Sequence, residues 1–220
     1  EFLGRFPFNA TNSQKKSIET ILNDMARDFP MSRLLEGDVG SGKTAVAATA
    51  SYVVISSTPP TPSPKGRTPS PLERAGERLT ILQVAYMAPT EILATQHFES
   101  FIQYFRHLPI NIGLITGSGC RKFPSKLNPD GWTPISRAQL LKWTANGEIS
   151  ILIGTHALIQ KTVKFKNLAL VIIDEQHRFG TTQRRKFVHR DEKGNSVAPH
   201  LLSMTATPIP RTLALTIYGD

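Results

Sequence analysis

A glycine-rich turn sets the architecture of this chain: Gly37-Asp38-Val39-Gly40-Ser41-Gly42-Lys43-Thr44. Its spacing is that of a P-loop, in which backbone N–H groups and the positive end of a helix hold a chain of phosphates. The short apolar stretch Arg33-Leu34-Leu35 precedes the turn, and the helix-favouring run Thr44-Ala45-Val46-Ala47-Ala48 opens after it. Because this context of strand, loop and helix is what the motif requires, we expect a nucleotide-binding α/β domain.

Two side chains of the turn have separate predicted roles. Lys43 would reach the β and γ phosphates of a nucleoside triphosphate, and the Thr44 hydroxyl would ligate Mg²⁺. Gly37, Gly40 and Gly42 let the backbone turn tightly around the phosphates. The alternative is a glycine-rich turn with an incidental lysine, and a second motif far downstream argues against it.

That second motif is the acidic pair Asp174-Glu175, within Asp174-Glu175-Gln176-His177. The six residues before it, 168–173, are all apolar and predict a buried parallel strand. This strand would deliver both carboxylates to its carboxyl end, where the ligands of open α/β sheets bind. Asp174 would hold Mg²⁺, usually through water, while Glu175 would orient and polarise the attacking water. The two motifs together predict nucleotide hydrolysis.

Helix and strand patterns alternate along the chain. Apolar residues at helical spacing predict an amphipathic helix over residues 12–29, ended by Pro30. Another helix is predicted to start at Ser136 and to stop at Asn146-Gly147. Strand signals recur over 33–36, 80–87, 110–115, 149–153, 168–173 and 201–204. Strands that alternate with helices indicate a parallel, doubly wound sheet, and residues 1–220 are expected to form one such domain.

Two stretches do not follow this alternation of helix and strand patterns. Residues 56–78 are rich in proline and polar residues, a composition that cannot bury enough apolar surface to offset chain entropy. We expect a flexible surface insert there, with a ligand for a proline-reading module as the alternative. Residues 117–134, which include the only cysteine, Cys120, are also expected to form a loop. Contact with a phosphate backbone and simple exposure to solvent are equally open for its basic residues, Arg121, Lys122 and Lys126.

The chain is basic, with 26 Lys and Arg against 17 Asp and Glu, a net charge of +9 and a pI of about 9.9. This charge indicates a polyanionic partner such as nucleic acid, with ordinary solubilising charge as the alternative. A single cysteine excludes an internal disulfide and fits a reducing cytoplasm. No apolar run approaches the roughly 20 residues that span a bilayer, so no membrane partner is expected. The chain begins at Glu1 without a signal peptide, and we expect it to be a piece of a longer protein.

Four motifs in this order resemble the motor of a superfamily 2 helicase: the P-loop, Met87-Ala88-Pro89-Thr90-Glu91-Ile92-Leu93, Asp174-Glu175-Gln176-His177 and Ser203-Met204-Thr205-Ala206-Thr207. Their details resemble the RecG family, as do Gly154-Thr155-His156-Ala157-Leu158-Ile159-Gln160 and Thr205-Ala206-Thr207-Pro208-Ile209-Pro210-Arg211-Thr212-Leu213. The resemblance covers nearly the whole chain except the proline-rich insert and residues 117–134. It implies the first of two RecA-like lobes, a three-layer domain whose mostly parallel sheet is flanked by helices. It further implies an ATP-dependent DNA helicase of the bacterial cytoplasm and nucleoid that remodels replication forks and Holliday junctions in recombination and repair.

The resemblance also implies site residues. Gln14 would read the adenine edge of ATP with its amide, which offers both a donor and an acceptor. Phe8 fits two interpretations equally, stacking on the adenine ring or packing as an ordinary core aromatic. Loops after predicted strands would contact the DNA backbone without reading bases: Pro89, Thr90, Thr116, Gly117, Gly154, Thr155 and His156. Taken singly, each of these loop features is better explained as a helix cap, and only their shared order favours contact with DNA.

Coupling between the nucleotide and strand movement would involve Thr205-Ala206-Thr207. By the resemblance, the two threonines would hydrogen-bond toward Asp174, Glu175 or His177. A structural role for His177 is an alternative, and metal ligation is disfavoured because no cluster of metal-binding side chains accompanies it. A second motor lobe and a wedge domain are expected partners outside this chain, and without them we expect little or no activity.

Three rival functions stay open. A transcription-repair coupling translocase has a closely related motor, although Gly40-Ser41-Gly42 and Gln176 favour the RecG family. A P-loop phosphotransferase would need a lid for its acceptor substrate and has no use for Thr205-Ala206-Thr207. A non-catalytic nucleic-acid-binding module with a relict P-loop is disfavoured, because no essential motif residue is degraded.

Overall fold

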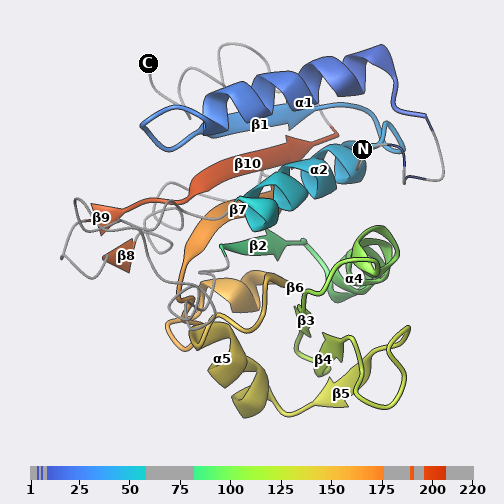
Figure 1. Ribbon diagram of the computed structural model, residues 1–220, viewed down its shortest axis with the longest axis vertical. Coiled ribbons are helices and arrows are strands. Elements are labelled where there is room, and N and C mark those ends of the chain that lie inside the picture. The colour runs from blue at the N-terminus through green and yellow to red at the C-terminus, as the bar shows by residue number, and fades with distance from the viewer. Residues whose placement is uncertain are drawn as a thin grey trace, which may run out of the picture.

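The computed structural model describes residues 4, 6, 9–57, 82–175, 189–190 and 196–206. Its centre is an eight-stranded sheet in the order β1-β10-β7-β2-β6-β3-β4-β5 (Figure 1). The strands are β1 Ser32–Glu36, β2 Gln83–Met87, β3 Ile112–Ile115, β4 Cys120–Phe123, β5 Thr133–Ile135, β6 Ile151–Gly154, β7 Leu168–Asp174 and β10 His200–Thr205. The helices are α1 Asn12–Met25, α2 Lys43–Ser56, α4 Glu91–Phe105, α5 Arg137–Ala145 and the 3-10 helix η2 His156–Ile159. A separate antiparallel pair consists of β8 His189–Arg190 and β9 Ser196–Val197.

The six strands from β1 to β3 in the sheet order all pair in parallel. They are the six strands expected from the sequence, with small shifts at their ends. Parallel neighbours require crossover connections, which place strands that are distant in sequence side by side. Strand β10 illustrates this, because it comes last in the chain yet lies between β1 and β7. The expected mostly parallel α/β sheet is confirmed.

The side chains of each strand alternate between the two faces of the sheet, and this divides the hydrophobic core into two halves. In β7, Leu170 and Ile172 pack with α1, α2 and α4 on one face of the sheet, whereas Val171 and Ile173 pack with α5 and η2 on the other (Figure 1). Successive side chains of a strand point to opposite faces, so Asp174 falls on the face of Leu170 and Ile172. The result is the three-layer arrangement implied by the helicase resemblance. In the described ranges no helix is long and apolar enough to cross a bilayer.

Helix α1 is shorter than expected. It ends at Met25 rather than at Phe29, and Phe29 is 59% exposed, so that side chain is not part of the buried stripe. Near the end of the helix, the carboxylate of Asp24 accepts a hydrogen bond from Arg33 of β1, and this bond holds the pKa of Asp24 below its ordinary value. The assignment of Pro30 as the terminator is therefore wrong, because α1 ends at Met25 and its C-cap is Ala26.

The expected loop at residues 117–134 is wrong where β4 and β5 lie. These strands extend the sheet beyond β3 in antiparallel pairing. The Arg121 guanidinium lies 4.2 Å from the centroid of the Trp132 ring, and Lys122 Nζ lies 5.8 Å from that of Trp143. Cationic side chains can cover aromatic rings in this way. The polar pattern that indicated a loop thus belongs to a hairpin at the sheet edge.

The expected ends of the second helix are confirmed. Ser136 is the N-cap of α5, and its hydroxyl accepts from Gln139 N at 3.2 Å. The helix closes at Asn146, followed by Gly147 with φ of 80°, a conformation that glycine adopts without strain. Of the proline-rich insert, Ser56 ends α2 and residues 58–78 lie outside the described part of the chain.

Candidate nucleotide and nucleic-acid site

The P-loop follows β1 and leads directly into α2. Gly40 and Gly42 have φ of 81° and 83°, in the left-handed region that favours glycine. Gly42 is also the N-cap of α2, so the first N–H groups of the helix face the turn. Lys43 Nζ donates to Gly37 O and, at 2.8 Å, to Asp38 O. The turn therefore gathers an ammonium group and backbone donors in one place.

Gln14 links the start of α1 to the P-loop. Its Oε1 accepts from Thr11 N at 2.9 Å, and Thr11 Oγ1 accepts from Gln14 N, which together form a capping box. Its Nε2 donates to Ser41 O at 2.7 Å. The amide that was predicted to read adenine is thus fixed against the phosphate-binding turn.

Gly42→Ala is expected to destabilise the chain more than Gly40→Ala. Both positions have positive φ, which costs alanine about 1–2 kcal/mol of unfolding free energy. A Cβ at Gly42 would lie 2.2 Å from Gln14 Nε2, whereas a Cβ at Gly40 has no heavy atom within 4 Å. Gly42→Ala therefore also breaks the Gln14–Ser41 hydrogen bond, a further cost of about 1 kcal/mol. Urea unfolding measures both variants, and equal losses would show that Gln14 is not held against the turn.

Strand β10 aligns the P-loop with the acidic strand end. Met204 pairs with Leu35 of β1 on one side and with Asp174 of β7 on the other. Just beyond β1, Gly37 N donates to Thr205 O at 3.2 Å. Since these strands are parallel, the P-loop, Asp174 and the start of the predicted coupling segment lie at the same edge of the sheet.

Side chains of β2 and α4 surround Asp174. His97 Nε2 lies 3.0 Å from Asp174 Oδ2 and donates to it, because a carboxylate can only accept. The Tyr86 hydroxyl lies 3.4 Å from both ring nitrogens of His97. Burial, reinforced by the charge of Asp174, raises the pKa of Tyr86 well above its ordinary value. Polar contacts thus run from Tyr86 of β2 through His97 of α4 to the acidic strand end.

The oxygens of this cluster suit Mg²⁺. Thr44 offers a hydroxyl and Asp174 a carboxylate, and both are hard oxygen ligands of the kind that Mg²⁺ prefers. Mg²⁺ is usually held by one or two carboxylates together with substrate phosphates rather than by an all-protein cage. Within the described ranges, no group of three or more His, Cys, Asp or Glu side chains could form such a cage.

Glu175 has an uncommon backbone conformation. It follows β7 directly and has φ of 56°, the left-handed region. Residues other than glycine adopt this region at a cost, and such strain clusters at functional sites where the surroundings hold it in place. The strand end that carries the predicted acidic pair is therefore a sharp, constrained turn.

The loops predicted to contact DNA lie side by side. Met87 of β2 and Ile115 of β3 both pair with Gly154 of β6. A Cβ at Gly154 would lie 2.5 Å from Ile115 O, so the close approach of the two strands requires glycine there. The loops that follow these strand ends carry the predicted residues: Pro89, Thr90, Thr116, Gly117, Thr155 and His156.

Three threonines at this edge of the sheet are hydrogen-bonded within the protein or buried. Thr90 is the N-cap of α4, and its hydroxyl accepts from Leu93 N at 3.3 Å. The Thr116 hydroxyl donates to Gly119 O at 3.0 Å, and Thr155 is 5% exposed. In this conformation the Thr90 hydroxyl therefore acts as a helix cap, which was the alternative to DNA contact. The three side chains shape the loops, while Gly117 and His156 are exposed.

Glu91, at the start of α4, ties two of these loops together. Its carboxylate accepts from Gly117 N at 2.7 Å and from Ser118 N at 3.3 Å. Interaction with the Ser118 side chain, followed by the hydrogen bond from the Gly117 backbone, holds the pKa of Glu91 below its ordinary value. A contact between Gly117 N and a phosphate would therefore require Glu91 to move aside.

Comparison with known proteins gives the family. The model of DEAD/DEAH box helicases matches residues 11–216. The chain belongs to this family. It is 45% identical to the ATP-dependent DNA helicase RecG of Aquifex aeolicus, over 98% of the chain and 22% of that protein. Identity to the RecG of Haemophilus influenzae is 43%, over 100% of the chain and 26% of that protein.

A solved structure of RecG bound to a three-way DNA junction is also similar to this chain. The TM-score is 0.68 at 37% sequence identity, and the match covers 100% of this chain and 24% of that one. The chain thus spans about a quarter of the length of these RecG relatives. Family and fold together establish a helicase domain that uses ATP.

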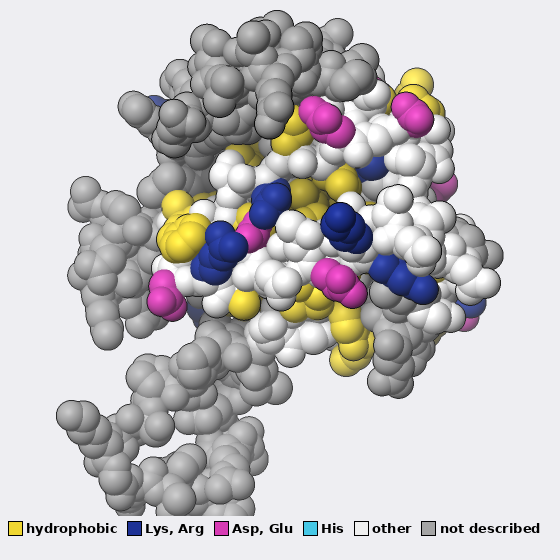
Figure 2. All heavy atoms as spheres, turned by 90° about the horizontal axis from the view of Figure 1, so that it is seen from above, with side chains coloured by type: hydrophobic (Ala, Val, Ile, Leu, Met, Phe, Trp, Pro, Cys, Tyr) yellow, Lys and Arg dark blue, Asp and Glu magenta, His cyan; other side chains and the backbone are white. Residues whose placement is uncertain are grey.

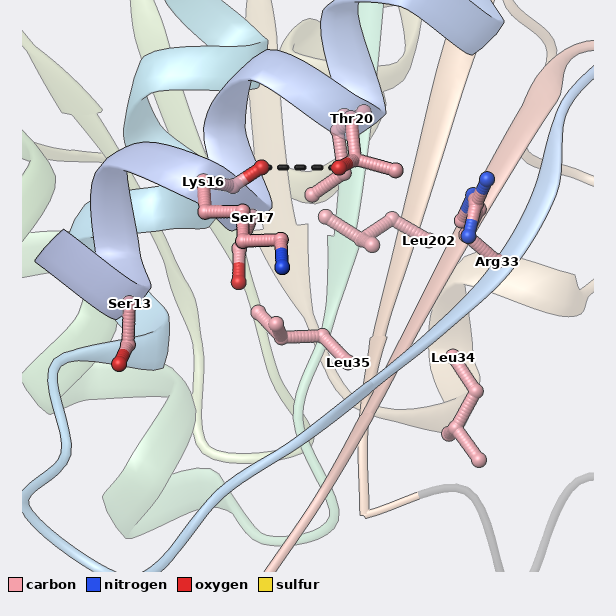
Figure 3. Close-up of a pocket in the computed structure, with 9 residues that line it drawn as sticks. Ser13, Lys16, Ser17, Thr20, Arg33, Leu34, Leu35 and Leu202 are labelled. Atoms are coloured by element: carbon pink, nitrogen blue, oxygen red, sulfur yellow. Dashed lines mark hydrogen bonds between the residues drawn. The ribbon is translucent and has the colours of Figure 1, made fainter.

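The face of this helicase domain that carries α1 and β1 is of mixed charge. Figure 2 shows Lys and Arg side chains lying among Asp and Glu side chains there, so the basic excess is not gathered into one patch on that face. A groove on α1, β1 and Leu202 of β10 is lined by Ser13, Lys16, Ser17, Thr20, Ile21, Arg33, Leu34 and Leu35 (Figure 3). Its described lining includes none of the predicted site residues of the helicase.

Some predictions for the helicase site lie outside the described residues: Phe8, His177 and Thr207. Their roles stay predictions. Sequence reasoning missed three residues of the described edge: Tyr86, Glu91 and His97. For His97 a signal exists, because it lies between Ala94 and Phe101 on the buried stripe of α4, where a polar side chain needs a partner.

Proposed function

We propose that this chain is the first RecA-like, ATP-binding motor lobe of a RecG-like DNA helicase that remodels branched DNA. The observation that carries the proposal is the alignment of parallel strand ends. Strands β1, β10 and β7 bring the P-loop beside Asp174, and β2, β6 and β3 bring the loops at 89–90, 154–156 and 116–117 to the same edge. Similarity to RecG, including a structure of RecG on a three-way junction, supports branched DNA as the substrate.

In the proposed nucleotide site, Lys43 binds the β and γ phosphates beside the N-terminus of α2. Thr44 and Asp174 would hold Mg²⁺, which neutralises charge on the phosphates when bound. Glu175 orients the attacking water. Gln14, beyond its two bonds to the protein, retains one amide hydrogen and one oxygen lone pair for the adenine edge.

Coupling to DNA is assigned to β10 and the segment after it. Thr205 accepts from Gly37 of the P-loop, and its neighbour Met204 pairs with Asp174, so movement of this strand would reach both halves of the nucleotide site. The second motor lobe of the intact protein would add an arginine finger, worth about 10³–10⁵ in rate in other NTPases. The chain alone should therefore hydrolyse ATP poorly.

The test measures the ATPase rate of the intact protein with forked, duplex or single-stranded DNA. The three DNAs are compared at the same concentration, counted in DNA nucleotides. We expect forked DNA to stimulate hydrolysis most, and DNA affinity to fall as salt rises, because phosphate contacts release counterions. Stimulation that requires a stalled RNA polymerase instead of a fork would favour the transcription-repair coupling translocase. An ATPase indifferent to every DNA would refute a DNA motor.

A further inference from the structure

We infer that His97 is a positioning residue for the magnesium ligand Asp174, and that Tyr86 holds the His97 ring for this role. The inference rests on the proposed nucleotide site and adds two residues to it. Both residues lie outside the P-loop and the acidic motif, on β2 and α4. Tyr86 contacts His97, and His97 contacts Asp174.

The His97 ring is held firmly. It projects from the middle of α4, where the neighbouring side chains Phe98 and Phe101 are fully buried. Its ring centroid lies 4.7 Å from that of Tyr86, and only 12% of its side chain is exposed. Packing on this scale restricts rotation of the ring, so the Nε2–H group stays directed at Asp174.

Asp174 gains a defined orientation from this bond. It is the last residue of β7, and the chain turns sharply at Glu175, whose φ is 56°. Oδ2 accepts from His97 at 3.0 Å, which leaves Oδ1 and the remaining lone pair of Oδ2 for an ion or its water. Carboxylates that ligate metals are commonly oriented by a hydrogen bond of this kind.

Tyr86 helps to fix the orientation and tautomer of the His97 ring, because its hydroxyl lies 3.4 Å from the ring nitrogens. Tyr86 is 0% exposed, so its own hydroxyl hydrogen needs a protein acceptor. His97 Nδ1, unprotonated when Nε2 carries the hydrogen, is 3.4 Å away. Donors therefore run in one direction from Tyr86 through His97 to Asp174.

A purely structural role makes a different prediction. If the cluster only stabilised the packing of α4 on the sheet, replacing His97 would lower the stability of the fold and leave metal affinity unchanged. If His97 orients Asp174, metal affinity falls while nucleotide binding without metal is preserved. The two roles separate when metal and nucleotide are titrated independently.

The experiment titrates Mn²⁺, a paramagnetic substitute for Mg²⁺, into the chain with ADP and follows free Mn²⁺ by electron paramagnetic resonance. His97→Leu is expected to weaken Mn²⁺ affinity by about 10–100-fold, with ADP binding in EDTA unchanged. His97→Gln, whose Nε2 can donate from a similar position, should recover most of the affinity. Gln96→Leu, at the adjacent exposed position of α4, serves as the control and should match the unaltered chain. In the intact protein, His97→Leu should raise the Mg²⁺ concentration for half-maximal ATPase more than it lowers the rate at saturating Mg²⁺.

Each outcome addresses a separate claim. An unaltered chain that binds ADP but no Mn²⁺ overturns the proposed magnesium site itself. Tight Mn²⁺ binding by the unaltered chain and equally by His97→Leu overturns only the positioning role. Should His97→Leu fail to fold, Tyr86→Phe decides, since it removes a single hydroxyl and should weaken Mn²⁺ binding several-fold. Unchanged affinity in folded Tyr86→Phe would likewise overturn the inference.

Discussion

Lys43→Ala is expected to lower the affinity of the chain for ATP by about 100-fold. A hydrogen bond to a charged group contributes about 1.5–3 kcal/mol, and Lys43 would contact two phosphates of the nucleotide. Its ammonium already lies against Gly37 O and Asp38 O of the turn, so the side chain needs little reorganisation to meet an anion there. In the intact protein the same change should reduce DNA-stimulated ATPase to background.

The fold should survive this substitution. Lys43 lies on the rim of the turn and belongs to neither half of the hydrophobic core. Lys142→Ala, at an exposed position of α5 on the other face of the sheet, removes the same charge and should leave affinity unchanged. Titration with a fluorescent ATP analogue, alongside urea unfolding, measures both properties. A folded Lys43→Ala chain with undiminished affinity would remove the P-loop from the nucleotide site.

The parallel centre of the fold could be predicted because its strands are recognisable one at a time. Buried parallel strands are continuous apolar runs, and residues 168–173 form such a run that coincides with β7 apart from its last residue. Once the strands are found, their carboxyl ends must line up at one edge. The convergence of the P-loop, Asp174 and the strand-end loops follows from that rule, and the observed register agrees with it.

The edge hairpin could not be predicted by the same reasoning. Strand β5 is three residues long and contains Pro134, which is tolerated at a sheet edge but reads as a loop signal. In β4, Arg121 is polar in sequence yet lies over the Trp132 ring. Strand β4 pairs with the edge of β3, and β5 pairs with β4. This pairing depends on the tertiary structure, so a local sequence pattern does not reveal it.

The cluster around Asp174 was missed for a related reason. His97 and Asp174 are 77 residues apart, and their contact depends on β2 and β7 being neighbours in the sheet. Strand order determines which face of α4 meets which strand end, and composition carries no information about it. Motif reasoning therefore predicted the P-loop and Asp174 as parts of the proposed nucleotide site, but not the side chains that contact Asp174.

Glu175→Gln is expected to preserve ATP binding and to lower the rate of hydrolysis in the intact protein by about 10²–10⁴-fold. That is the range in which a positioned general base contributes, and glutamine keeps the size of the side chain while removing its basicity. Affinity should stay within about twofold, because the phosphates are assigned to Lys43 and the helix end rather than to Glu175. Single-turnover hydrolysis and equilibrium ATP binding measure the two effects separately.

The strained backbone at Glu175 supplies the control for this experiment. With φ of 56°, this position favours glycine, so Glu175→Gly should relieve about 1 kcal/mol of strain while also removing the carboxylate. Glu175→Gln keeps the strain, and its unfolding free energy should match that of the unaltered chain. If both variants lose turnover, the missing carboxylate is the cause, because only one of them changes the backbone preference. Normal hydrolysis by Glu175→Gln would assign the activation of water to another residue.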